Sequence, residues 1–332
     1  MENRYLPILH ENISLSVLRV SNESRLTGRM GGANRSECKV FPDLGNNLSQ
    51  ALNREPEWSK MKFSLSTAVS GVSSGPILLR GPVHEVFPLV AELGYDGLEL
   101  HLLHPNQVNR NEVRKLMSQY ILAVTTIGTG MAASIEGLTF ADPDPEVRRR
   151  AVMRVKEQID LALFLGSAVT IGLLMGRLGN DSADRPNRYD AAVVCLDECC
   201  KVAAQKGVTV LLEPLNRYES DYVNTVDDVL KIIRDLGLPN VKLLTDTFHM
   251  NIEETHLAAS LKRVGPNLGF VHLADSNRQA PGHGHLDIRG VLGALRDMGY
   301  QGYLSFEILP LPTPRQAAED AIRFVKGILS SL

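Results

Sequence analysis

The chain has 332 residues, enough for one large domain or two, and its composition is that of an ordinary globular protein. Its net charge of −3 and sequence pI of about 6.3 argue against a duplex-DNA binder, whose affinity depends on cationic contacts to phosphate. Its apolar runs fall short of the ~18–20 residues of a membrane span. These features favour a soluble protein that binds neither nucleic acid nor membrane.

The first 60 residues differ from the rest of the chain. They are rich in Asn, Ser, Glu and Arg, their apolar periodicity is weak, and no apolar core follows a basic start as in a secretory signal. We predict that residues 1–60 are a disordered extension or the product of an upstream start codon. A small ordered appendage is the alternative. The predicted catalytic domain is 61–332, where MKFSLSTAV begins a strand-like run.

The four cysteines do not form the pair of CxxC motifs typical of a structural zinc site. They are Cys38, Cys195, Cys199 and Cys200, and three of them lie close together on one predicted helix. This pattern indicates reduced, partly buried thiols in a cytoplasmic protein.

From Met61 onward, short apolar runs alternate with amphipathic helical patterns. The runs read as near-continuous apolar segments, as expected for parallel strands buried on both faces. The predicted strands are Phe63–Val69, Gly97–Leu102, Ala123–Gly128, Ala168–Leu173, Val208–Glu213, Lys242–Asp246, Gly269–Leu273 and Tyr303–Ile308. Eight β/α units predict a (β/α)8 TIM barrel. The alternative, a doubly wound open sheet that binds a dinucleotide, would carry a glycine-rich loop after its first strand, and this sequence does not.

The predicted helices carry start and stop signals. In TVDDVLKIIRDLG, Thr225 is placed to cap, Asp228 occupies the capping-box position, and Gly237 ends the helix. Asp287 is predicted to cap a later helix. Pro88 is an exception to these signals, because a proline must either lie in the first turn of its helix or kink the helix.

Four successive predicted strands end in residues that can bind a metal. They are Glu213, Asp246, His272 and Glu307, each separated from the next by about one β/α unit. In a TIM barrel the carboxyl ends of the strands meet at one mouth, where active sites lie. Three carboxylates buried together repel one another, and a divalent cation cancels that repulsion. Carboxylates with one imidazole suit Mn²⁺ best here, with Co²⁺ or Mg²⁺ as alternatives.

Three further polar residues follow these predicted ligands within three to six positions of the sequence. His249 follows Asp246, Arg278 follows His272, and Glu219 follows Glu213. We predict that they contact substrate oxygens near the metal. A loop ion pair or a surface histidine is the alternative for each.

Several motifs resemble the xylose isomerase-like superfamily of sugar isomerases and epimerases. EPLNRYESDYVNT, DTFHMNIEE, HLADSNRQAPGHGHLD and SFEILPLP are similar to its ketose 3-epimerase branch, which includes D-tagatose and D-psicose 3-epimerases. GTG and IGLLMGR look closer to the 5-keto-L-gluconate epimerases. The resemblance begins at Met61 and runs to the C-terminus, whereas the segment 178–188 matches poorly.

The resemblance implies an enzyme of the isomerase class, commonly a dimer or tetramer. Glu213 and Glu307 match its acid/base pair and, with Asp246 and His272, its metal ligands. His249, Arg278 and Glu219 match its substrate contacts. The expected reaction is epimerisation of a ketose or keto-hexonate through a cis-enediolate.

Arg177 follows the fourth strand and is a candidate partner for the carboxylate of a keto-hexonate. A salt bridge at the rim is the alternative. Three other enzymes of the same barrel stay open as alternatives: a hydroxypyruvate-type isomerase, an inosose dehydratase and, more remotely, an abasic-site endonuclease.

Overall fold

The computed structural model describes residues 61–69 and 75–332. Its strands are β1 (Lys62–Ala68), β2 (Leu79–Arg80), β3 (Gly97–His101), β4 (Ala123–Gly128), β5 (Ala168–Ile171), β6 (Val210–Leu212), β7 (Val241–Asp246), β8 (Leu268–His272) and β9 (Tyr303–Phe306). The predicted boundary between an extension and a catalytic domain depends on residues 1–60, which lie outside the described residues.

The strands form a closed parallel barrel. Every neighbouring pair from β1 through β3 to β9 is parallel, and β9 pairs back onto β1, with Phe63 opposite Leu304. The short β2 only extends β1 at its carboxyl end, with Thr67 opposite Leu79. The predicted eight-stranded TIM barrel is therefore confirmed. The sequence did not predict β2, because a strand of two residues leaves no recognisable pattern.

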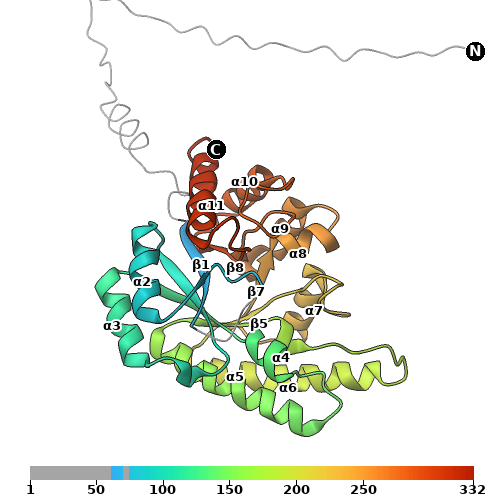
Figure 1. The fold of residues 1–332 in the computed structure, drawn as a ribbon. Coiled ribbons are helices and arrows are strands. Elements are labelled where there is room, and N and C mark those ends of the chain that lie inside the picture. Colours follow the sequence, from blue (N-terminus) through green and yellow to red (C-terminus); the bar gives the residue numbers. More distant parts are fainter. Residues whose placement is uncertain (1–60, 70–74) are drawn as a thin grey trace, which may run out of the picture. The chain divides into compact units, whose positions relative to one another are not determined.

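Helices surround this barrel (Figure 1). They are α2 (Val83–Glu92), α3 (Arg110–Tyr120), α4 (Gly130–Glu136), α5 (Pro145–Leu165), α6 (Arg185–Gln205), α7 (Val226–Leu236), α8 (Thr247–Glu253), α9 (Leu257–Val264), α10 (Ile288–Asp297) and α11 (Pro314–Leu329). Among the described residues, none of the helices has the length and apolar character needed to cross a bilayer.

The predicted helix signals are largely confirmed. Thr225 and Asp228 form a reciprocal capping box on α7, and Gly237 ends that helix at φ +63°. Asp287 caps α10 by accepting from the backbone N–H of Gly290. Of the two alternatives for Pro88, the first turn is excluded, because Pro88 lies inside α2. It cannot donate a backbone hydrogen bond to His84 one turn earlier, but His84 is exposed and water can serve its carbonyl.

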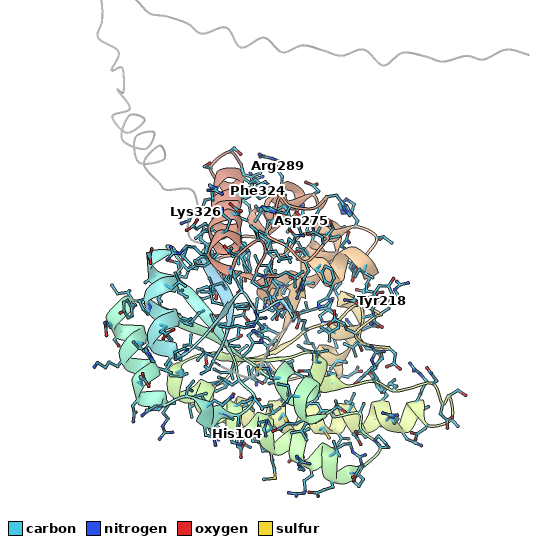
Figure 2. The ribbon with its side chains drawn as sticks, viewed as in Figure 1. His104, Tyr218, Asp275, Arg289, Phe324 and Lys326 are labelled. Carbon is cyan, nitrogen blue, oxygen red and sulfur yellow. The ribbon has the colours of Figure 1, made fainter. Side chains whose placement is uncertain are left out.

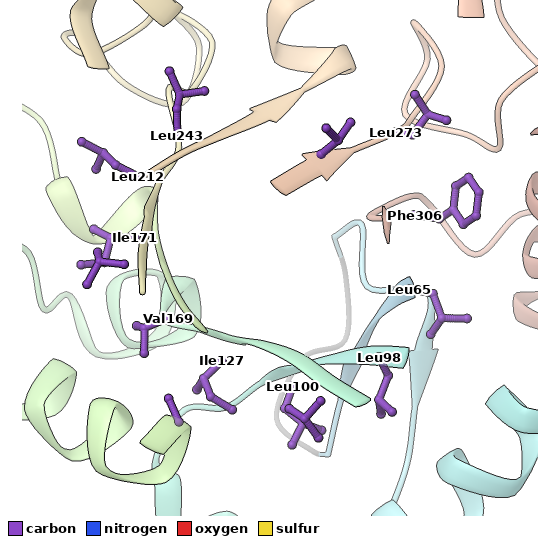
Figure 3. Packing of buried hydrophobic residues seen from close by; sticks show 14 of the residues in the cluster. Leu65, Leu98, Leu100, Ile127, Val169, Ile171, Leu212, Leu243, Leu273 and Phe306 are labelled. Carbon is purple, nitrogen blue, oxygen red and sulfur yellow. The ribbon is translucent and has the colours of Figure 1, made fainter. Parts of the chain in front are cut away.

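The hydrophobic core lies mainly between barrel and helices. Side chains such as Leu98, Ile127, Ile171 and Leu243 point outward from the strands and are fully buried (Figure 3). A smaller cluster of Leu211, Leu244 and Phe270 packs apart from it. Because side chains alternate along a strand, the residue two positions after each of these three points the same way. Those residues are Glu213, Asp246 and His272, so the apolar cluster forms a floor beneath the predicted ligands.

Candidate active site

A cavity of about 560 Å³ opens at the carboxyl ends of the strands. It brings together residues from opposite sides of the barrel. Its lining includes six of the eight predicted site residues, together with apolar side chains from the helices and loops around the barrel mouth: Glu213, Glu219, His249, His272, Arg278, Glu307, Ile77, Met131, Leu173, Leu215 and Phe248.

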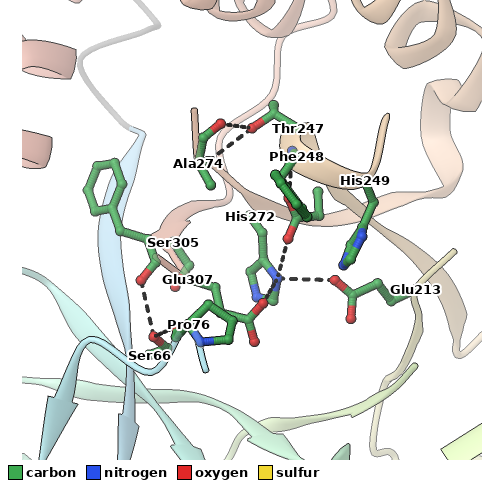
Figure 4. A network of polar contacts seen from close by, with 12 residues as sticks. Ser66, Pro76, Glu213, Thr247, Phe248, His249, His272, Ala274, Ser305 and Glu307 are labelled. Atoms are coloured by element: carbon green, nitrogen blue, oxygen red, sulfur yellow. Dashed lines mark hydrogen bonds and ion pairs between the residues drawn. The ribbon is translucent and has the colours of Figure 1, made fainter. Parts of the chain in front are cut away.

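The four predicted metal ligands converge at the base of this cavity. One candidate ligand atom from each of Glu213, Asp246, His272 and Glu307 lies within 4.8 Å of the others. His272 Nδ1 is 3.3 Å from Glu213 Oε1 and 3.6 Å from both Asp246 Oδ2 and Glu307 Oε2 (Figure 4). The four side chains are at most 12% exposed. Three carboxylates and an imidazole at this spacing form a donor set that fits one divalent cation.

Local structure explains how two of the predicted ligands are held. Asp246 caps α8: its Oδ1 accepts from the backbone N–H of Phe248, so Oδ2 is left to face the cluster. Thr247 anchors the same helix to the end of β8 by donating to the carbonyl of Ala274 and accepting from its N–H (Figure 4). On Gly172, a Cβ would stand 2.8 Å from Glu213 Oε2, so a side chain at position 172 would displace this carboxylate from its place in the cluster. The capping role of Asp246 is compatible with its predicted role as a ligand.

Crowding of the carboxylates perturbs their acidity. Burial raises the pKa of Glu307 to about 8; His272 and Arg278 oppose this shift, and Glu213 and Asp246 add to it. Burial also acts to raise the pKa of Asp246, but the nearby charges of Arg278 and His249 hold it well below its usual range. The pKa of His272 lies well above 6.5, because surrounding carboxylates outweigh the effect of burial. Positive charge at this position is therefore stabilising, as expected for a cation site.

Arg278 reaches into the same cluster. Its guanidinium donates to Asp246 and Glu307, and it lies over the ring of Phe248 at 4.9 Å. Its backbone has φ +63°, an uncommon conformation outside glycine that the loop after β8 maintains. The N–H of Arg278 donates to the carbonyl of Asp275, and its own carbonyl accepts from Leu309. Strained backbone of this kind is often found at functional sites.

His249 and Glu219 line the cavity and are joined by a residue that the sequence did not single out. Asn216 donates through its side-chain amide to Glu219, at 3.0 Å. The same amide lies 2.7 Å from His249 Nδ1, which also accepts from the backbone N–H of Asn216. The proton of a neutral His249 is therefore on Nε2. Only its position inside EPLNRYE, three residues after the predicted ligand Glu213, could have indicated Asn216.

Of the two predicted site residues outside the cavity lining, Asp246 belongs to the ligand cluster, whereas Arg177 lies outside both. Its guanidinium donates to the backbone carbonyl of Tyr218, whose side chain is 74% exposed (Figure 2). The carbonyl of Arg177 in turn accepts from Arg188. In this arrangement Arg177 ties two loops together at the rim.

Two residues of β3 join the site without having been predicted. Glu99 is fully buried, and His272 Nε2 lies 3.1 and 3.2 Å from its two oxygens. Burial acts to raise the pKa of Glu99, but the charge and hydrogen bond of His272 hold it at about 2. His101 lines the cavity with Nε2 3.8 Å from Glu307 Oε1. Gly128 makes room for this ring, since a Cβ there would stand 2.5 Å from it.

Comparison with known proteins identifies the family. A sequence model described as the xylose isomerase-like TIM barrel matches residues 87–328. L-ribulose 3-epimerase of Methylomonas sp. (strain DH-1) is 32% identical over 220 residues, which are 65% of this chain and 75% of the relative. A solved L-ribulose 3-epimerase, 27% identical, aligns with a TM-score of 0.69 over 82% of this chain and 95% of its own. The chain belongs to the xylose isomerase-like TIM barrel family.

The relatives agree with the branch indicated by the motifs. The 3-dehydro-D-guloside 4-epimerase of Escherichia coli (strain K12) is 32% identical over 251 residues, 73% of this chain and 93% of the relative. The D-psicose 3-epimerase of Enterocloster bolteae is 31% identical over 64% of this chain and 72% of the relative. These relatives are named as epimerases, in agreement with the isomerase class predicted from the sequence.

Proposed function

We propose that this protein is a divalent-metal-dependent sugar epimerase that inverts the carbon next to the carbonyl of a ketose or keto-hexonate. The convergence of Glu213, Asp246, His272 and Glu307 at the base of the cavity is the observation that carries the proposal. The epimerase relatives support the reaction class. Candidate substrates are of the D-tagatose type or the 5-keto-L-gluconate and D-tagaturonate type.

The proposed site holds one Mn²⁺, Co²⁺ or Mg²⁺ ion through these four side chains. Such an ion supplies Lewis acidity, which stabilises negative charge on the sugar's carbonyl oxygen as the neighbouring C–H is deprotonated.

Glu213 and Glu307 are the proposed acid/base pair. One glutamate removes the proton at the carbon next to the carbonyl, a cis-enediolate forms, and the other returns a proton to the opposite face. A single base would return the proton to the face it left, so inversion of a carbon held in place is simplest with two flanking groups.

His249, Arg278 and Glu219 are the proposed substrate contacts. The Nε2–H of His249 and the guanidinium of Arg278 can donate to substrate oxygens as negative charge develops there. Glu219, with its side chain 41% exposed, is placed farther out to accept from a hydroxyl.

The charge of the substrate's far end separates the two substrate types. Among the described residues that line the cavity, Arg278 is the only arginine or lysine, and it already pairs with Asp246 and Glu307. A keto-hexonate carboxylate would therefore need Arg177 to turn inward from Tyr218. If Arg177 binds that carboxylate, Arg177→Ala weakens turnover of an acid substrate and spares a neutral ketose.

Solvent exchange tests the proposed reaction directly. The metal-loaded protein is incubated in D2O with D-tagatose, D-fructose, 5-keto-L-gluconate, D-tagaturonate, hydroxypyruvate and an inosose, and each carbon next to a carbonyl is followed by NMR. Deuterium entering at one carbon while the epimer accumulates is the expected result, and it identifies the substrate class.

The same experiment separates the alternatives. Conversion of a ketose to an aldose, or turnover of hydroxypyruvate, would indicate an isomerase, and loss of water from an inosose would indicate a dehydratase. An abasic-site endonuclease would cleave abasic DNA and exchange none of these sugars. No exchange on any substrate, with metal confirmed in the protein, would contradict the roles given to the two glutamates.

A further inference from the structure

Glu99 is a fully buried carboxylate in the middle of the barrel. It lies on β3, opposite the strands that supply the metal ligands, and it is 0% exposed. Its Oε1 accepts from the hydroxyl of Ser305 at 2.5 Å, and its Oε2 accepts from the hydroxyl of Thr126 at 2.8 Å. Burial of an ionised carboxylate costs free energy unless the group is paired and hydrogen-bonded. The presence of a buried glutamate with dedicated partners at this position therefore requires an explanation.

The third partner of Glu99 is the ring of His272. Both oxygens of Glu99 lie within hydrogen-bonding distance of His272 Nε2, at 3.1 and 3.2 Å. The other ring nitrogen, Nδ1, faces Glu213, Asp246 and Glu307 at 3.3 to 3.6 Å. The imidazole therefore spans two environments: one nitrogen points into the ligand cluster and the other onto Glu99.

A neutral imidazole has one protonated nitrogen and one with a lone pair, and only the lone pair can bind a metal. An ionised carboxylate beside Nε2 can only accept a hydrogen bond, so Glu99 favours the form of His272 that is protonated on Nε2 and has its lone pair on Nδ1. The hydroxyls of Ser305 and Thr126 restrain the carboxylate from both sides, which also fixes the orientation of the ring.

We propose that Glu99 is a positioning residue of the metal site, which holds His272 with Nδ1 free to bind the divalent cation. The proposal rests on the metal-dependent function proposed above and assigns to β3 a part in it. Carboxylates behind a ligating histidine raise its basicity, and removal of such a partner typically weakens metal affinity 10- to 100-fold. Glu99 touches neither the substrate nor the reacting carbon in this arrangement, so its effect is exerted through His272.

The test compares metal binding by metal-free Glu99→Leu, Glu99→Gln and the unaltered protein. Leucine is close in size but cannot accept a hydrogen bond, whereas glutamine keeps one acceptor oxygen without the charge. Calorimetric titration with Mn²⁺, normalised to folded protein, is expected to show affinity falling about 10- to 100-fold in Glu99→Leu and by a smaller factor in Glu99→Gln. Visible absorption of the Co²⁺-loaded proteins should change in Glu99→Leu, because it reports the ligands of the ion.

Glu254→Gln is the matched control. The side chain of Glu254 is also only 5% exposed, and it accepts from the N–H of Val226, the hydroxyl of Ser260 and the guanidinium of Arg263, outside the cavity lining. This variant is expected to lose some stability but to bind Mn²⁺ with unchanged affinity and an unchanged Co²⁺ spectrum. The control separates the general cost of altering a buried glutamate from an effect on His272.

The outcomes are distinguishable. If Glu99→Leu and Glu99→Gln bind Mn²⁺ within twofold of the unaltered protein, Glu99 has no positioning role. If Glu99→Leu does not fold, an unchanged affinity in Glu99→Gln alone is sufficient to overturn the proposal. If the unaltered protein itself binds none of Mn²⁺, Co²⁺ and Mg²⁺, the proposed metal-dependent function fails, and the role of Glu99 fails with it.

Discussion

At the scale of single residues, the proposed chemistry depends on two glutamates that line one cavity. Glu213 follows β6 and Glu307 follows β9, and each faces His272 Nδ1, at 3.3 and 3.6 Å. Their roles as acid and base are a proposal, and it leads to a sharp prediction.

Glu213→Gln and Glu307→Gln are each expected to reduce turnover by at least ~10²- to 10⁴-fold, because glutamine cannot take up or return the proton. Turnover is measured at saturating Mn²⁺, with the bound metal quantified in the same samples. Glu254→Gln serves again as the control for an altered buried glutamate. Near-full activity in either site variant with metal bound would remove that glutamate from the acid/base pair.

Metal binding is expected to depend on pH. A carboxylate must lose its proton to bind a metal, and the pKa of Glu307 is raised to about 8 by burial and by the neighbouring carboxylates. Below pH 8, binding therefore releases the proton of Glu307, and also that of His272, whose pKa is raised by the surrounding carboxylates against the effect of burial, so the apparent affinity for Mn²⁺ rises by about tenfold or more per pH unit between pH 6 and 8. Calorimetry across this range measures it. A pH-independent affinity would contradict the raised pKa.

The raised pKa of Glu307 has the opposite effect on the stability of the metal-free protein: metal affinity rises with pH, whereas this stability falls. A raised carboxyl pKa means that the folded state holds the proton more tightly than the unfolded state between pH 4.5 and about 8. The contribution of Glu307 to the free energy of unfolding therefore decreases as pH rises through this window. Asp246 and Glu99, whose pKa values are lowered, contribute stability that is lost only at more acidic pH.

At the scale of single elements, α7 shows how local sequence determines a helix. Thr225 Oγ1 accepts from the N–H of Asp228 at 3.2 Å, and Asp228 Oδ2 accepts from the N–H of Thr225 at 2.9 Å. Its buried face of Val226, Val229, Leu230, Ile232 and Ile233 packs into the core. Capping sets where this helix starts, and the apolar face determines how it docks.

Thr225→Ala is expected to lower the free energy of unfolding by about 1 kcal/mol, since a backbone N–H at the start of α7 loses its acceptor. Urea unfolding measures the loss, and turnover should be unchanged because α7 does not line the cavity. Lys231→Ala is the matched control on the same helix. It removes only an exposed pair with Asp235 and should cost a few tenths of a kcal/mol. Equal losses in the two variants would argue against the cap.

At the scale of the whole molecule, barrel closure depends on the first described strand. β1 pairs with β3 on one side and with β9 on the other, and the backbone N–H of Lys62 donates to the carbonyl of Gly302 at 3.1 Å. All the strands of the barrel and all the proposed site residues lie between residues 62 and 307.

A variant that begins at Met61 is therefore expected to fold with a similar Tm and to keep turnover within about twofold. Thermal unfolding and the epimerase assay test this expectation. A variant that begins at residue 70 is the control, because it lacks β1 and leaves β3 and β9 without their shared neighbour; it should not fold. Loss of folding in the longer variant would show that residues before Met61 belong to the barrel.

Much of this architecture could be predicted from the sequence because parallel barrel strands are buried on both faces. Continuous apolar runs revealed the strands, and the polar residues that end four of them had to meet at the carboxyl face. Glu213, Asp246, His272 and Glu307 were therefore recognisable by position alone. The bounds of the strands differ from the predicted ones by no more than two residues at either end.

The sequence could not indicate which side chains point into the barrel, or which residues lie close together across it. Glu99 lies inside a strand rather than at its end, and in an apolar run nothing shows which side chains point inward. Its contact with His272, 173 residues away along the chain, exists only because the barrel closes. Arg177 follows a strand as the predicted ligands do, yet its loop directs it toward Tyr218. The sequence alone thus determined the barrel and the residues at its mouth, because these follow from periodicity. Only the tertiary structure decided which side chains meet, because that depends on how the closed strands and their loops orient them.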